Sequence, residues 1–334
     1  MNTSVVCTVL NEGQNVQKLL DSLAGQTHAP DEIIVVDGGS FDDTVAILKR
    51  YAATRGLPLK VIVEPGANIS RGRNAAIAAA AGPLIASTDA GVRLDQHWLE
   101  ELYKPFQNDP PAAVVSGFFV PDPQSAFEAA MGATVLPALS DVNPATFLPS
   151  SRSIAFLKSS WQAARGYPEW LDFCEDLVFD FRLRAEFGEF AFAPGAIAYF
   201  RPRGSLSAFF KQYYQYARGD GKADLWRKRH AIRYLTYLAA LPLLLVLGLI
   251  VSPWWWLIIA VLGGPGLFFR PYQRLPRLWR PLSKMEKLQA ICWIPIIRIA
   301  GDIAKMIGYP VGWKWRLVRL STQPELRWHC RKTL

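Results

Sequence analysis

The sequence is poor in the residues that most often bind transition metals. It contains four cysteines and four histidines in 334 residues. The cysteines (Cys7, Cys174, Cys292 and Cys330) fall in no metal-binding or redox spacing, so we expect free thiols. The histidines form neither an HExxH motif nor a catalytic-triad signature. No GxGxxG follows the first predicted strand, and no GxxxxGK is followed by Ser or Thr, which weakens dinucleotide and nucleoside-triphosphate readings.

Acidic residues are scarce in the C-terminal third of the chain. Residues 226–334 carry 18 Lys and Arg against 3 Asp and Glu, whereas residues 1–225 carry 19 against 25. The net charge of +9 therefore belongs to the last third alone. Such a basic segment is typical of a protein that meets nucleic acid or an anionic membrane surface.

A long uncharged run favours the membrane. The 36 residues from Tyr234 to Phe269 contain no charged side chain, and Ser252-Pro253 divides them into 18 and 16 residues. A bilayer span needs about 20 apolar residues, so the run predicts a tight helical hairpin, 234–269. Arginines and a lysine flank both ends, so we expect both ends in the cytosol and the turn outside. The alternative is a buried pair of core helices; a nucleic-acid binder is disfavoured because the basic residues flank apolar spans.

A second apolar segment, Leu288–Tyr309, is interrupted by Arg298, Asp302 and Lys305. Its basic tail argues against crossing, so we expect an interfacial or re-entrant helix, with a third membrane helix as the alternative. The N-terminus leads directly into a strand-like segment without a basic start and a long apolar region, so we expect the N-terminal domain to stay in the cytosol.

Strand and helix patterns alternate over the first 110 residues. The expected strands are Ser4–Leu10, Glu32–Val36, Leu59–Val63 and Leu84–Ser87, and the expected helices are Gly13–Leu23, Thr44–Tyr51, Arg71–Ala81 and His97–Phe106. Such alternation predicts an α/β fold with a mostly parallel sheet and helices on both faces.

Acids follow three of the four predicted strands. The first strand ends at Asn11-Glu12, the second at Asp37-Gly38-Gly39-Ser40, and the fourth at Asp89-Ala90-Gly91. Ligands of parallel sheets bind beyond the carboxyl ends of the strands. One acid there is more often a helix cap than a ligand, but three on one rim predict a binding site.

Together and in order, four stretches resemble family 2 glycosyltransferases, which have the GT-A fold. They are VCTVLNEGQNV (6–16), DEIIVVDGGSFDDT (31–44), ISRGRNAAIAAAAGPLIASTDA (69–90) and GYPEWLDFCEDLVFDFRLRAEFG (166–188). The resemblance covers about residues 3–200. The membrane tail resembles that of bacterial members that make exopolysaccharides and glycolipids.

The resemblance implies a role for each matching residue. Nucleotide-sugar binding falls on Leu10, Asn11, Glu12, Asp37, Gly39, Arg71, Arg73, Asn74 and Asp89. The family's DxD motif, which binds Mg²⁺ or Mn²⁺, falls on Asp89-Ala90-Gly91, where glycine replaces the second acid. Its acid pair falls on Glu175-Asp176, with Asp176 as the catalytic base.

The chemistry makes the same demands independently. A nucleoside diphosphate leaves with negative charge, so a divalent metal on carboxylates, or arginines such as Arg71 and Arg73, must neutralise it. Asp89 could hold the metal alone or with Asp95. A carboxylate must take the proton of the acceptor hydroxyl, and direct displacement inverts the anomeric carbon. Asp176 precedes an expected helix, Leu177–Glu186, so a helix cap is the alternative for it.

Two further segments carry candidate sugar or acceptor residues. Ser151 and Arg152 lie in FLPSSRSIAFLK (147–158), which could also be an ordinary strand with exposed polar residues. Arg203 and Arg218 flank an aromatic-rich helix, Ser205–Arg218, that suits a membrane interface. They could reach the diphosphate or contact lipid headgroups. The helix lacks the Trp of the QxxRW motif of processive synthases, which favours single transfer.

The sequence thus predicts a cytosolic GT-A catalytic domain (1–225) and a membrane-associated region (226–334) in a bacterial inner membrane. The predicted activity is inverting transfer from a UDP- or GDP-sugar to a lipid-linked acceptor. The alternatives are a processive polysaccharide synthase and a non-catalytic scaffold of the same fold, which the Gly91 departure would suit.

Overall fold

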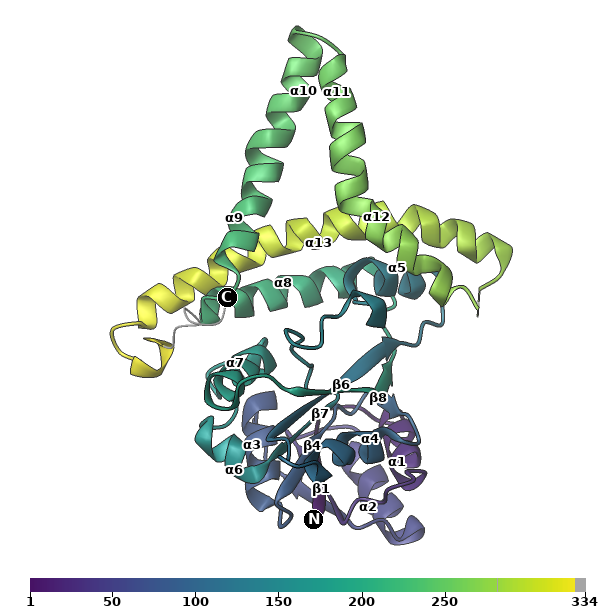
Figure 1. Cartoon of the computed structure of the whole chain (residues 1–334), viewed down its shortest axis with the longest axis vertical. Coiled ribbons are helices and arrows are strands. Elements are labelled where there is room, and N and C mark those ends of the chain that lie inside the picture. The colour runs from purple at the N-terminus through teal and green to yellow at the C-terminus, as the bar shows by residue number, and fades with distance from the viewer. Residues whose placement is uncertain (281, 328–334) are drawn as a thin grey trace. The chain divides into compact units, whose positions relative to one another are not determined.

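A computed structural model describes residues 1–280 and 282–327 (Figure 1). The described chain forms two compact units. The first comprises Met1–Asp122 and Ala138–Arg201, and the second comprises Pro123–Pro137 and the described residues from Pro202 onwards. The assignment of residues 1–225 to a catalytic domain and 226–334 to a membrane-associated region stays a prediction.

The first half of the sheet is the predicted parallel one. Its strands are β1 (Thr3–Val9), β2 (Glu32–Asp37), β3 (Leu59–Val63) and β4 (Leu84–Ser87). β2 and β4 pair with the two edges of β1, and β3 pairs with β2, all in parallel. The carboxyl ends of these strands therefore share one rim, as predicted.

The second half corrects the prediction of a mostly parallel sheet. Its strands are β5 (Val92–Leu94), β6 (Val114–Pro121), β7 (Ile154–Leu157) and β8 (Ala191–Phe200). The full order is β3-β2-β1-β4-β7-β6-β8-β5. β7 runs antiparallel to β4 and β6, β5 runs antiparallel to β8, and only β6 and β8 are parallel. Strand β7 reverses direction because the segment before it does not return through a crossover helix on the sheet.

Helices cover both faces of the sheet, which confirms that part of the prediction. One face packs on α1 (Asn15–Ala24), α2 (Thr44–Arg55) and α4 (Trp98–Tyr103, continued by η1, Lys104–Gln107). The other packs on α3 (Ile69–Ala79), α6 (Lys158–Ala163) and α7 (Glu175–Phe187). Within β1, Val5 and Cys7 lie in the first core and Val6 in the second, because successive side chains of a strand alternate between faces.

The second unit is helical. Its core joins α5 (Ala126–Val135), α8 (Leu206–Ala223) and α13 (Lys284–Arg319). α13 begins with a capping box, in which Ser283 and Glu286 satisfy each other's backbone N–H groups. Two short turns, η5 (Leu275–Leu278) and η6 (Pro324–Arg327), flank α13, and η2 (Leu139–Asp141) belongs to the first unit.

The uncharged run forms two helical arms, which Figure 1 shows in green. The first arm comprises α9 (Arg227–Leu235), the π-helical turn η3 (Thr236–Ala240) and α10 (Leu241–Ile250); the second comprises α11 (Trp254–Ile258), η4 (Ile259–Gly263) and α12 (Gly264–Arg274). The chain turns at Ser252-Pro253, as predicted.

In the described part of the chain, one helical run, Arg227–Ile250, is long and apolar enough to cross a membrane. Its most apolar window has a mean hydropathy of 1.8 and is 6% buried. The predicted second arm and the segment Leu288–Tyr309, which lies inside α13, do not meet the same criterion. The membrane helices of the C-terminal region therefore stay a prediction, for which one arm has the required length and composition.

Candidate active site

Arg73 lies at the centre of the predicted acids. It projects from α3, is 2% exposed, and joins two distant segments. Its Nη2 donates to Asp89 Oδ1 at 2.7 Å, and its Nη1 donates to Glu175 Oε1 at 2.6 Å. The structure thus brings together two of the predicted site acids, the one after β4 and the one at the start of α7, through Arg73; their roles stay a prediction.

The Asp89 carboxylate is held by two arginines. Arg73 binds one oxygen, and Arg152 Nε lies 3.2 Å from the other. Burial alone would raise the pKa of Asp89, but Arg73 and then Arg152 outweigh it, so the pKa is lowered. Asp89 is therefore ionised. Arg152, a predicted sugar or acceptor residue, lies beside it, and its guanidinium stacks over the Phe200 ring at 4.5 Å.

The acid pair begins helix α7. The N-cap is Cys174, and no side chain caps the helix; Asp176 lies in the first turn, where Leu177 N donates to its Oδ1 at 2.9 Å. Burial, and then repulsion by Asp176, raise the pKa of Glu175 to about 7. Burial also raises the pKa of Asp176, against the opposing effect of Arg73. These acids are therefore tuned toward neutral pH, which a general base requires.

Sequence reasoning missed two buried residues beside the cluster. Tyr167 lies beneath the Arg73 guanidinium, 5.2 Å from ring centre to Cζ, and stacks on Phe179 at 4.1 Å. Its hydroxyl shares a 2.9 Å hydrogen bond with Ser151, which is buried, so Ser151 supports the site from below. Asp180 follows Asp176 by one helical turn and is 1% exposed; burial and then Asp176 raise its pKa.

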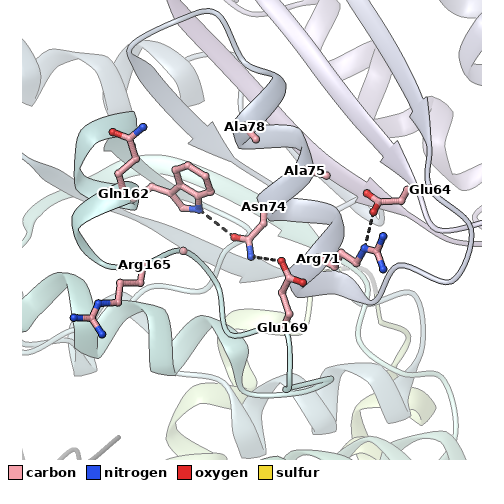
Figure 2. Close-up of a pocket in the computed structure, with 10 residues that line it drawn as sticks. Glu64, Arg71, Asn74, Ala75, Ala78, Gln162, Arg165 and Glu169 are labelled. Atoms are coloured by element: carbon pink, nitrogen blue, oxygen red, sulfur yellow. Dashed lines mark hydrogen bonds and ion pairs between the residues drawn. The ribbon is translucent and has the colours of Figure 1, made fainter. Parts of the chain in front are cut away.

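Two predicted nucleotide ligands lie on another face of α3. The Asn74 amide donates to Tyr167 O and Glu169 Oε1 and accepts from Trp161 Nε1 and Tyr167 N, at 2.8–3.0 Å (Figure 2). Arg71 is paired with Glu64 at 2.5 Å. The amide of Asn74 thus fixes the turn that carries Tyr167.

Arg71 and Asn74 also line an open pocket of about 520 Å³. Figure 2 shows the side chains of Gln162 and Arg165 across from them. The structure therefore does not bring Arg71 and Asn74 to the acid cluster, although Arg73 lies between them in the sequence.

The polar residues that follow β1 and β2 hydrogen-bond mainly to each other and to their own backbone. Asp37 is 0% exposed and accepts hydrogen bonds from Gly39 N and Ser40 N, both at 2.9 Å, and from the Ser40 hydroxyl. Asn11, in the left-handed region at φ 54°, donates from its N–H to Ser40 Oγ at 2.8 Å. Gly39 has a φ angle of 99°, a backbone conformation that residues with a side chain rarely adopt.

Leu10 and Glu12 line a cavity of about 220 Å³ between this loop and the start of α3. Gly38, Asn68 and Gly72 complete its walls. Leu10 is 54% exposed, and the Glu12 N–H donates to Thr44 Oγ1 at 3.0 Å. Of the predicted nucleotide-binding residues, only Leu10 and Glu12 line this cavity, and Gly38 is the residue from the end of β2 that lines it.

Few side chains near Asp89 could serve as metal ligands. Within residues 1–280 and 282–327, no group of three or more His, Cys, Asp or Glu side chains could hold a metal ion. Asp95, the predicted helper, accepts from His97 N at 3.0 Å in the turn before α4. At Gly91 an added Cβ would meet no heavy atom within 4 Å, so packing does not require glycine there.

Arg203 and Arg218 belong to the second unit. Arg203 is exposed before α8, and Arg218 lies in α8 and is half-buried. Their predicted role at the diphosphate or at lipid headgroups stays a prediction.

Known proteins share the first part of this chain. Residues 4–137 match the sequence model described as "Glycosyl transferase family 2". The glycosyltransferase AglE of Haloferax volcanii is 33% identical over 100 residues, which are 29% of this chain and 33% of AglE. The chain matches between 26% and 33% of the length of its curated relatives.

Solved structures share the fold. The mannosyltransferase PcManGT of Pyrobaculum calidifontis, in complex with GDP-Man and Mn²⁺, is 18% identical with a TM-score of 0.62, over 91% of this chain and 87% of that one. Residues 1–349 of TarS from S. aureus, in complex with UDP-GlcNAc, are 19% identical with a TM-score of 0.50, over 95% and 92%. The chain therefore carries a glycosyl transferase family 2 domain on a GT-A-like fold, as its motifs predicted.

Proposed function

We propose that the chain is an inverting glycosyltransferase that moves a sugar from a nucleotide-diphosphate donor to an acceptor hydroxyl. The observation that carries this proposal is the pair Glu175 and Asp176 at the start of α7, whose pKa values are raised by burial beside Arg73. A half-buried carboxylate with a raised pKa is a suitable general base near neutral pH. The family 2 match over residues 4–137 supports transfer as the reaction.

In the proposed reaction Asp176 accepts the proton of the acceptor hydroxyl. The hydroxyl oxygen forms a bond to the anomeric carbon, and the bond between that carbon and the phosphate oxygen breaks. The electron pair leaves with the nucleoside diphosphate. Because a single displacement from the opposite face does this in one step, the anomeric configuration is inverted.

The two arginines of the cluster have different tasks in this proposal. Arg73 is 2% exposed and bound to two acids, so it orients Asp89 and Glu175 and balances their charge. The Arg152 side chain is 22% exposed and so can reach a ligand. Arg73 and Arg71 are the arginines predicted for the departing diphosphate, but Arg73 is buried and Arg71 pairs with Glu64 away from the acids, so Arg152 is the better partner.

Asp89 is the residue that would hold a divalent cation. Among the carboxyl groups around Arg73, that of Asp89 has a lowered pKa, whereas those of Glu175, Asp176 and Asp180 have raised pKa values, so Asp89 is the ionised ligand available. A diphosphate would add negative charge, which Mg²⁺ or Mn²⁺ would offset. Mg²⁺ accepts one protein carboxylate with phosphate oxygens and water, and PcManGT is a fold neighbour in complex with Mn²⁺.

The cavity lined by Leu10 and Glu12 is the proposed place of the nucleotide. The loop that Asp37 holds through Gly39 and Ser40 would form its wall. A UDP- or GDP-linked sugar is the proposed donor, and the two fold neighbours are in complex with GDP-Man and UDP-GlcNAc.

We propose a lipid-linked acceptor and an inner-membrane location, with the catalytic domain facing the cytosol. The run Arg227–Ile250 has the length and composition of a membrane helix. Basic residues precede it, which favours a cytosolic start. Exposed Arg203 would suit lipid headgroups near such a helix.

The proposal is tested with the full chain in detergent, a panel of nucleotide sugars and a membrane lipid extract. We expect nucleotide release with one donor and a loss of kcat of about 10²–10⁴-fold in Asp176→Asn, as removal of a general base implies. Glu186→Gln, the same change at an exposed position of α7, should keep wild-type activity. Equal activity of Asp176→Asn and wild type would refute the assignment, and donor binding without turnover would favour a non-catalytic scaffold.

A further inference from the structure

A second polar cluster lies in the helical unit. Asp302 of α13 is buried, and three side chains converge on its carboxylate. Arg233 Nε of α9 donates to Oδ1 at 2.7 Å, and the Tyr237 hydroxyl of η3 donates to Oδ2 at 3.0 Å. Arg298 Nε, one turn earlier on α13, lies 3.3 Å from Oδ2.

This cluster has more cations than it can pair. Asp302 faces Arg233 and Arg298, and Lys305 lies one helical turn further along α13. No carboxylate of the described residues forms an ion pair with Lys305, whose Nζ lies 5.0 Å from the centre of the Tyr213 ring. The next acid, Asp220, lies 3.2 Å from His230. Arg233 and Arg298 therefore share the Asp302 carboxylate, and the charges of Asp302 and Asp220 act on Lys305 without an ion pair.

The shortage of negative charge affects the pKa of Lys305 and the hydrogen bonding of Arg298. Burial, and then repulsion by Arg233, lower the pKa of Lys305 to about 8, although Asp302 opposes this. Arg298 Nε lies 3.3 Å from Asp302 Oδ2 but makes no hydrogen bond. Burying a charge or a polar group without its hydrogen bonds is costly. An anion bound here would reduce that cost.

The position of the cluster limits the kind of anion. Arg233 and Tyr237 belong to the first turns of Arg227–Ile250, the run that could cross a membrane. The ends of membrane helices lie at the level of lipid headgroups, which carry phosphate. Arginine is the preferred partner of phosphate because its planar group donates several hydrogen bonds.

We infer that Arg233, Arg298 and Lys305 form a binding site for a phosphate group, carried by a lipid headgroup or by free phosphate. The Asp302 carboxylate, which also accepts from the Tyr237 hydroxyl, orients Arg233 and Arg298. The site goes beyond the proposed transfer reaction, because it needs neither the nucleotide sugar nor the acids around Arg73.

Thermal unfolding of the purified full chain in non-ionic detergent, without nucleotide sugar, tests the site. The probes are dioctanoyl phosphatidic acid, inorganic phosphate and, as a lipid without phosphate, dioctanoylglycerol, at matched ionic strength. A ligand that binds the folded state raises Tm with concentration. We expect a rise with phosphatidic acid, with inorganic phosphate, or with both, and none with dioctanoylglycerol.

The variants separate binding from folding. Lys305→Met removes a half-buried charge that has no ion pair with a carboxylate of the described residues, so we expect an unchanged or higher Tm without ligand but an apparent affinity at least about ten-fold weaker, the loss of one charged hydrogen bond. Lys314→Met, at an exposed position of the same helix, should respond like wild type. Arg298→Gln serves as a second test if Lys305→Met does not fold.

The outcomes identify the source of the phosphate. A response to both phosphate probes assigns the site to phosphate in general, and a response to phosphatidic acid alone assigns it to a lipid headgroup. No response in wild type, or equal responses of wild type and Lys305→Met, would overturn the site. Asp176→Asn should respond like wild type, so this site and the proposed transfer reaction can fail separately.

Discussion

Arg73 shows how one side chain can organise a site that the sequence distributes over a hundred residues. It donates to Asp89 and Glu175, and burial, which would lower its pKa, is outweighed by these two acids, so the pKa is raised. A permanent cation between two acids keeps both oriented. Arg73 thus acts on the reaction through the acids it holds.

The raised pKa values of the acid pair predict how activity depends on pH. A raised pKa leaves a carboxyl protonated, and so unable to accept a proton, at lower pH. Burial raises the pKa of the base Asp176 and raises that of its neighbour Glu175 to about 7, so we expect kcat/KM to fall as pH decreases, with a midpoint well above about 4, and to level off at higher pH. A pH–rate profile measures this limb, which Glu186→Gln should not move. A midpoint near 4, the ordinary value of a carboxyl group, would contradict the assignment.

Gly91 predicts a gain of metal binding. Because a Cβ at this position meets no heavy atom within 4 Å, Gly91→Asp should fold like wild type and place a second carboxylate near Asp89. We expect Mn²⁺ to bind about ten-fold more tightly, since hard divalent cations prefer carboxylate ligands. Calorimetric titration measures this, and Gly91→Asn is the matched neutral control. Equal affinities of the two variants would show that Asp89 and position 91 do not share a metal.

The same residues show what the sequence can predict about a site. Asp89, Glu175 and Asp176 were found because each follows a predicted strand or starts a predicted helix within a motif. The bonds of Asn74 to Tyr167, 93 positions further along the chain, depend on tertiary packing and leave no local pattern. Asp37 was predicted to bind the nucleotide. Its burial and its hydrogen bonds to its own loop depend on the folded backbone and cannot be inferred from the sequence.

At the scale of elements, all four N-terminal strands and the helices between them were predicted. Period and length identify such elements, since parallel strands are apolar and the helices between them have one apolar face. The second half of the sheet was predicted incorrectly, because β5 has 3 residues and the direction of β7 depends on partners distant in sequence. Local patterns do not encode such pairings.

The close approach of α8 and α13 predicts a stability effect. A Cβ at Gly312 would overlap the carbonyl of Arg218, and one at Gly308 would overlap the carbonyl of Tyr214. Gly312→Ala should therefore destabilise the helical unit by about 1–3 kcal/mol, the usual cost of overpacking. Thermal unfolding in detergent measures it. At Gly264 of α12 a Cβ meets nothing within 4 Å, so Gly264→Ala should leave Tm unchanged or slightly raise it. Similar losses in both variants would contradict the packing argument.

At the scale of the whole molecule, charge and apolar surface are divided along the chain. Exposed apolar side chains occur along both arms and along α13; in the arm that follows α9, Leu238 is 67% and Leu249 is 73% exposed. Soluble monomers rarely expose contiguous apolar surface of this extent. An apolar environment must therefore surround this arm. A lipid bilayer fits the length of the arm, and basic residues stand at its start.

This division predicts how the chain partitions between membrane and water. Wild type should remain in the membrane pellet after alkaline carbonate washing, because Arg227–Ile250 buries its apolar surface in lipid. Replacing exposed Leu243 and Leu245 by Arg should release the chain, since an arginine at the centre of a span costs about 2.5–3.5 kcal/mol. Leu139→Arg, at an exposed position of the first unit, should stay in the pellet. If wild type itself is washed off, or if the double variant is retained as well as Leu139→Arg, the run does not cross the bilayer and another surface must cover it.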